Sequence, residues 1–167
     1  MRCLCLTLVF AAAVMTTGPH ANQATSQPPG PISEQDYEAI MKKVGPAYAA
    51  LAKDLDAGEV DRAAKDAQQL SDLFGEAEKF WARNKREDAV KWSQAARRHA
   101  AEVAAGLGAA RGYLRSDSKV QSGVQARLSR ARTSVTTLGN VCQQCHKAYR
   151  EGDAKSGFHI KASALVH

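Results

Sequence analysis

Apolar residues recur at alternating intervals of three and four along four stretches of the chain, the spacing that puts them on one face of an α-helix. The stripes run over residues 37–55, 60–81, 92–114 and 124–149. Short polar turns separate them, and we find no strand pattern, internal repeat or second domain. Four amphipathic helices with short connections predict an all-α fold, an antiparallel up-down-up-down four-helix bundle.

Local signals refine these helices. Ser33 is expected to cap the first helix, with Asp36 favourable in its first turn. The pair Gly45-Pro46 should bend this helix without ending it, because the stripe continues in phase. Gly106 and Gly108 mark a place on the third helix where a neighbouring helix would approach closely.

Both ends of the chain differ from the helical part. Residues 1–21 begin with a charged residue, continue with an apolar run of about a dozen residues and end in small residues, a pattern typical of a secretory signal peptide. The apolar run is too short to span a bilayer. Residues 22–32 are rich in Gln, Ser and Pro and predict a flexible leader. The helical domain is expected over 33–152 and a C-terminal tail over 153–167. The sequence therefore predicts a periplasmic protein without a transmembrane anchor.

Charge narrows the range of partners. The formal net charge is +6, and the basic residues are spread along the helices. For an exported chain without a basic cluster we expect no nucleic-acid partner. We also find no nucleophile–base pair or carboxylate dyad, so the sequence does not predict an enzyme.

The strongest motif is Cys142-Gln143-Gln144-Cys145-His146, near the end of the fourth stripe. Cys-x-x-Cys-His is the attachment signature of c-type haem, in which two thiols bond the porphyrin vinyl groups and the histidine binds iron. Residues three apart lie on one helix face, so Cys142 and Cys145 can reach one edge of the macrocycle together. Both lie on the apolar face, which places one covalent haem near the C-terminal end of the fourth helix.

Two other interpretations of the motif stay open. A zinc site would combine Cys142 and Cys145 with two of His146, His159 and His167, although structural zinc normally takes four committed ligands. A thioredoxin-like redox pair would need a βαβ context that this sequence lacks. Removal of the signal peptide takes away the other two cysteines, Cys3 and Cys5, and leaves the motif pair available for haem.

Met41 is the leading candidate for a second axial ligand. In an antiparallel bundle, Met41 and Cys142 both lie roughly 12 Å from the same end, at about 1.5 Å per residue. The alternatives are a purely packing role for Met41, the adjacent Ile40 facing the iron, and His99 as a rival ligand one turn away. Phe80, Trp81 and Trp92 flank the second turn and are expected to line the same pocket.

In two segments the chain resembles the class II cytochromes c, the cytochrome c prime family with its low-spin members. These are Cys142 to Arg150 (Cys-Gln-Gln-Cys-His-Lys-Ala-Tyr-Arg) and Tyr37 to Lys42 (Tyr-Glu-Ala-Ile-Met-Lys) followed by Gly45. The resemblance implies a periplasmic four-helix bundle with one haem c, held by Cys142, Cys145 and His146, with Arg150 beside the proximal face. Tyr37 departs from the Arg often found in the first helix, and the tail beyond Arg150 is longer than usual.

These observations lead to one expectation and one alternative about function. We expect a monohaem carrier that passes one electron through Fe(III)/Fe(II) to a redox partner protein, with His146 proximal and Met41 distal. If the distal position is open, the resemblance implies a five-coordinate binder of diatomic gases such as nitric oxide or carbon monoxide. A haem-free, metal-binding bundle is a further alternative. Many family members pair through helix faces, so a homodimer is compatible with the sequence.

Overall fold

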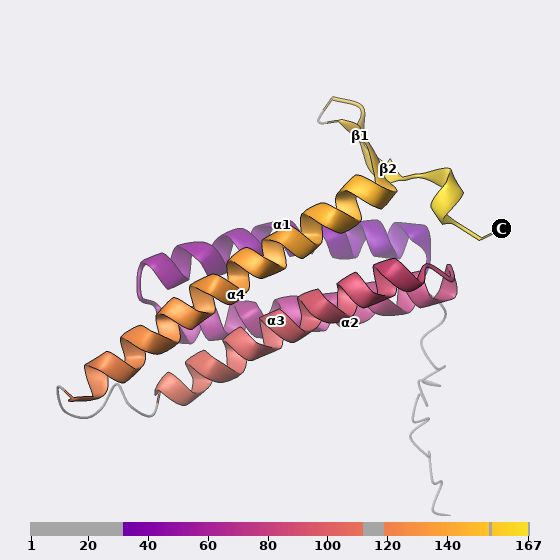
Figure 1. The fold of residues 1–167 in the computed structure, drawn as a ribbon. Helices are drawn as coiled ribbons and strands as arrows, with labels where there is room; N and C mark the ends of the chain where they lie inside the picture. Colours follow the sequence, from indigo (N-terminus) through magenta and orange to yellow (C-terminus); the bar gives the residue numbers. More distant parts are fainter. Residues whose placement is uncertain (1–31, 112–118, 154, 167) are drawn as a thin grey trace, which may run out of the picture. The chain divides into compact units, whose positions relative to one another are not determined.

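The computed structural model describes residues 32–111, 119–153 and 155–166. Within these, four helices are followed by a two-stranded hairpin and a short 3-10 helix (Figure 1). The elements are α1 (Glu34–Asp56), α2 (Val60–Arg83), α3 (Glu87–Arg111), α4 (Lys119–Tyr149), β1 (Arg150–Asp153), β2 (Gly157–Ile160) and η1 (Ala162–Ala164). The prediction of four helices is confirmed. The predicted signal peptide, the predicted leader up to residue 31 and most of the connection between the third and fourth predicted helices lie outside the described residues.

The first helix begins where its capping residues predict. The Ser33 hydroxyl accepts a 3.1 Å hydrogen bond from the Asp36 amide, and the Asp36 carboxylate accepts a 3.0 Å bond from the Ser33 amide. This reciprocal pair satisfies amides that have no partner inside the helix. The helix then continues through Pro46 to Asp56, because the apolar stripe on both sides packs into the same core.

The buried side chains of all four helices form the core. The predicted stripe of α2 is buried throughout, and that of α4 is buried from Val124 to Leu138. The largest of the almost completely buried side chains are Trp81, Phe80, Leu51, Leu55, Leu70, Leu107 and Leu138. A second cluster, centred on Tyr37, Phe80 and Trp81, also includes Ile160 and Ala164 from the C-terminal segment. None of the helices in the described residues is apolar over a length that would cross a membrane.

Side-chain contacts show which helix ends meet. The Trp81 indole near the end of α2 donates to the Tyr37 hydroxyl near the start of α1. Arg62 near the start of α2 pairs with Asp54 near the end of α1, at 3.1 Å. The Tyr149 hydroxyl at the end of α4 donates to Asp88 at the start of α3, at 2.7 Å. One end of the helical domain therefore gathers the start of α1, the α2–α3 turn and the end of α4.

The structure corrects two expectations. The absence of strands was wrong, since β1 and β2 form an antiparallel pair in which Arg150 faces Ile160 and Glu151 faces His159. The segment 153–167 is accordingly more than a tail. The close approach at Gly106 and Gly108 was also wrong, because a Cβ built at either glycine has nothing within 4 Å. The neighbouring helix is instead approached at Gly139, where a Cβ would meet the Tyr48 hydroxyl at 2.7 Å.

Candidate functional site

A cavity of about 510 Å³ lies at the end of the helical domain where α1, α2, α3, α4 and β2 meet. Its size falls in the range of about 300–1,000 Å³ that is usual for ligand and cofactor sites. All five predicted site residues line it, and they come from two helices and the first position of β1: Met41, Cys142, Cys145, His146 and Arg150. The fold thus brings together residues that are about one hundred positions apart in the chain.

The two cysteines are free thiols. Burial raises the pKa of Cys142 to about 11 and that of Cys145 to about 12, and for Cys145 the nearby charges of Cys142 and Asp88 add to the increase. Buried thiols of this kind stay protonated at neutral pH and react slowly, because the thiolate is the nucleophile. The cavity therefore presents two neutral sulfur atoms at its α4 wall.

His146 is half-buried next to them. Burial lowers the pKa of its imidazole below the ordinary value, and the positive charge of Arg150 lowers it further. The imidazole is therefore neutral at pH 7, which is the form that binds a metal ion. Arg150 itself stacks its guanidinium over the Phe158 ring, 4.2 Å from the ring centroid.

Aromatic rings form one wall of the cavity. Trp81 lies edge-on to Tyr37 at 5.2 Å and 4.9 Å from Tyr149, and Trp92 lies 6.1 Å from Tyr149. These four rings line the cavity, as predicted for the two tryptophans. Phe80 was also expected there, but the structure places it behind Tyr37, stacked on that ring at 4.3 Å and only 2% exposed. It supports the wall from the core side.

The structure separates Met41 from its rivals. Met41 lines the cavity and also packs against the large core cluster, whereas the adjacent Ile40 packs against that cluster without lining the cavity. The α3 residues that line the cavity are Trp92, Ser93 and Ala96. His99 lies one turn further along α3 and does not line it. The Nδ1 atom of His99 is 3.3 Å from a Glu102 carboxylate oxygen, although its direction does not make a hydrogen bond. Of these three candidates, Met41 is the one that lines the same cavity as the motif.

Two parts of the lining were missed from sequence. Tyr48 lines the cavity on α1, donates a 3.2 Å hydrogen bond to the Val135 carbonyl and lies over Gly139. The sequence places Tyr48 on the apolar face of the first helix. Its contact with Gly139 depends on how α1 and α4 pack, which the sequence does not show. The strand β2 adds Phe158, His159 and Ile160. His159 is half-exposed, and its Nε2 atom lies 3.2 Å from Glu151.

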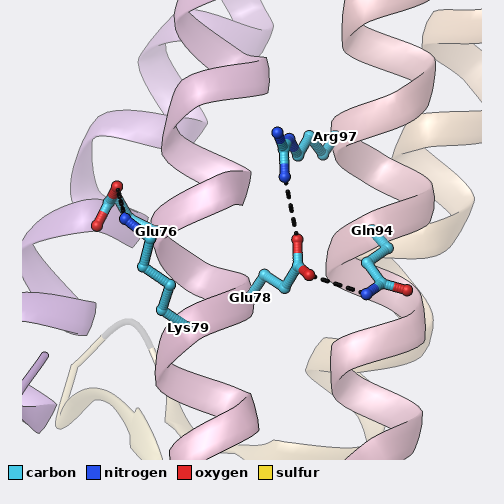
Figure 2. A network of polar contacts seen from close by, with 5 residues as sticks. All are labelled: Glu76, Glu78, Lys79, Gln94 and Arg97. Atoms are coloured by element: carbon cyan, nitrogen blue, oxygen red, sulfur yellow. Dashed lines mark hydrogen bonds and ion pairs between the residues drawn. The ribbon is translucent and has the colours of Figure 1, made fainter. Parts of the chain in front are cut away.

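A second, smaller hollow of about 290 Å³ lies on the outside of α2 and α3, away from the motif. Figure 2 shows its polar groups bonded to one another: Glu78 accepts a 2.8 Å hydrogen bond from Gln94 and pairs with Arg97 at 3.4 Å. Glu76 and Lys79 form a separate ion pair on α2, at 2.6 Å (Figure 2). Because Glu78 and Arg97 already pair with each other, this hollow is a poorer candidate than the cavity.

The donor set of the cavity fits a haem better than a bare metal ion. A thioether, an imidazole and two free thiols line a cofactor-sized space, and a Cβ built at Gly45 in the lining has nothing within 4 Å. By contrast, the described residues contain no group of three His, Cys, Asp or Glu side chains placed to hold a metal ion. Of the proposed zinc ligands, only His167 lies outside the described part of the chain.

Comparison of the chain with protein-family models, with curated proteins and with solved structures found no match.

Proposed function

We propose that this protein is a periplasmic, monohaem c-type cytochrome that carries one electron. The observation that carries the proposal is that both thiols and the imidazole of the Cys-x-x-Cys-His motif line the same cavity as the Met41 thioether. Haem, when bound, supplies an iron that alternates between Fe(III) and Fe(II). The proposal includes membership of the class II cytochromes c and their antiparallel helix order, which the contacts between helix ends support.

Each residue has a separate role in this proposal. Cys142 and Cys145 provide the two thioether bonds that fix the group to α4. His146 provides the proximal imidazole, held neutral by burial. Met41 would provide a thioether to the iron, a ligand that favours the ferrous state and raises the reduction potential. The aromatic rings make part of the lining apolar, which would disfavour the extra charge of the ferric state.

A covalent haem stain is the primary test. The full-length chain would be expressed with a c-type haem maturation system and run on a denaturing gel. We expect a haem-stained band in the periplasmic fraction, and its loss in the Cys142→Ser/Cys145→Ser variant. A matched control is Cys3→Ser/Cys5→Ser, which removes the same number of thiols outside the described residues and should keep the stain. Absence of stain in the wild-type protein would overturn the proposal.

Absorption spectra then separate the electron carrier from a gas binder. A low-spin spectrum in both oxidation states, unchanged by carbon monoxide, is the result expected with Met41 on the iron. A high-spin spectrum that shifts on addition of the gas would favour the five-coordinate alternative and leave Met41 as a packing residue. The homodimer and the redox partner belong to the same proposal and are tested by the mass of the haem-stained species in solution and by co-purification.

A further inference from the structure

The C-terminal segment Arg150–Val166, here called the strap, returns to the helix from which it starts. β1 continues directly from α4, and the hairpin register pairs Arg150 with Ile160. This register brings the next residue, Lys161, back beside Tyr149, whose carbonyl accepts a 2.9 Å hydrogen bond from the Lys161 amide. The strap is thus bonded to the last turn of α4 immediately after β2.

The Lys161 side chain adds two further bonds to this turn. Its ammonium group donates to the carbonyl oxygens of Lys147 and Ala148, at 3.2 and 2.8 Å. The last carbonyls of a helix have no partner within the helix and carry the negative end of its dipole. One residue therefore satisfies three consecutive carbonyls, and these directly follow His146 in the chain.

The other end of the strap is fixed to the α2–α3 turn. The Arg86 guanidinium donates to the carbonyls of Ala164, at 3.0 Å, and of Ser163. The Val166 amide donates to the Asn84 side chain at 3.1 Å. Ala164 is in addition buried in the cluster of Tyr37, Phe80 and Trp81. Because the strap is held at both ends, Lys161 links the last turn of α4 to the rest of the helical domain.

We propose that Lys161 is a positioning residue for His146: it fixes the turn that carries the imidazole so that the ring keeps one orientation toward the cavity. The inference rests on the proposed function in one respect, namely that His146 binds iron. A role in general stability would loosen the whole domain when Lys161 is changed, whereas a positioning role would loosen the end of α4 alone. The two are therefore distinguishable by a local measurement.

Hydrogen exchange of the full-length chain tests the positioning without haem. Lys161→Met keeps the length of the side chain but removes both hydrogen bonds of its ammonium group. Amide exchange over residues 142–149 should become at least about tenfold faster, because one hydrogen bond to a charged group already contributes about that factor. Lys161→Arg should restore slow exchange. Lys155→Met, an exposed lysine of the same hairpin, is the matched control and should match the wild-type protein. Unchanged exchange, or faster exchange across α2 as well, would overturn the inference.

The haem-stained protein supplies a second readout. The electron paramagnetic resonance spectrum of the oxidised protein depends on the orientation of the axial imidazole. We expect one species in the wild-type protein, Lys161→Arg and Lys155→Met, and more than one in Lys161→Met. A single unchanged species in Lys161→Met would contradict the role at His146. If no variant takes up haem, the proposed function fails, while the exchange experiment still decides whether Lys161 holds the turn.

Discussion

The indole of Trp81 donates a 3.2 Å hydrogen bond to the hydroxyl of Tyr37, and both side chains are at least 94% buried. This bond joins the end of α2 to the start of α1 at the aromatic wall of the cavity. Burial also raises the pKa of Tyr37 far above its usual value, so the hydroxyl stays neutral. Tyr37 stands where the resembled family often has an Arg. In this protein its side chain is a structural part of the cavity wall.

Tyr37→Phe should destabilise the protein by about 1–3 kcal/mol, because the Trp81 indole then becomes a buried donor without a partner. The ring would keep its stacking on Phe80, at 4.3 Å, so packing is preserved. Urea unfolding followed by circular dichroism measures the change. A difference of less than about 0.5 kcal/mol, the scatter of ordinary surface substitutions, would mean that water reaches the indole.

Met41→Ala should leave haem attached but convert the expected low-spin spectrum to a high-spin one that responds to carbon monoxide, because the thioether ligand is lost. Ile40→Ala is the matched control, since it shortens a neighbouring apolar side chain that packs on the core and does not line the cavity. Absorption spectra of both variants, with and without the gas, make the comparison. A low-spin Met41→Ala protein would exclude Met41 as the ligand.

Gly139→Ala should push Tyr48 away from its place, because the added Cβ would lie 2.7 Å from the Tyr48 hydroxyl. Loss of the bond from Tyr48 to the Val135 carbonyl is expected to cost about 0.5–1.5 kcal/mol. Tyr48→Phe loses the same bond and frees the space. The two changes should therefore be less than additive in a double-mutant cycle. Strict additivity of their unfolding free energies would show that the contact is absent in solution.

The free thiols of the haem-free protein should react slowly with iodoacetamide at pH 8. The pKa of Cys142 is about 11 and that of Cys145 about 12, against an ordinary value of 9.0. The thiolate fraction, and with it the alkylation rate, should be lower than in urea by roughly a hundredfold or more. Mass spectrometry of the chain at successive times measures the alkylation rate. Equal rates in buffer and in urea would contradict the burial of the motif.

The same pKa shifts predict a loss of stability at alkaline pH. A thiol whose pKa is raised on folding binds its proton more tightly in the folded state. Above pH 9 the unfolded chain loses these protons first, so the free energy of unfolding should fall between pH 9 and about pH 12. Urea unfolding at several pH values measures the slope, and Cys142→Ser/Cys145→Ser should reduce it. An identical slope in this variant would assign the effect to other groups.

The four helices and most residues of the candidate site were predictable from sequence. The spacing of apolar residues located all four helices, and Ser33 marked the first helix start correctly. Cys142, Cys145 and His146 could be selected from the sequence because they form one local motif, and all three line the cavity. Met41 followed from counting residues along two helices, and the cavity contains it.

Interactions between distant segments were decided only by the tertiary structure. The polar sequence after Arg150 contains no alternating pattern, and its strands form because the hairpin can close against α4 and place Ile160 and Ala164 in the core. Phe80 faces the core and Gly139 faces Tyr48 because of how the helices rotate against each other, which periodicity leaves free. Local spacing thus determined the helices and the motif by itself. The strap, the Tyr48–Gly139 contact and the cavity wall required the whole fold, because each depends on side chains that meet only after the chain has packed.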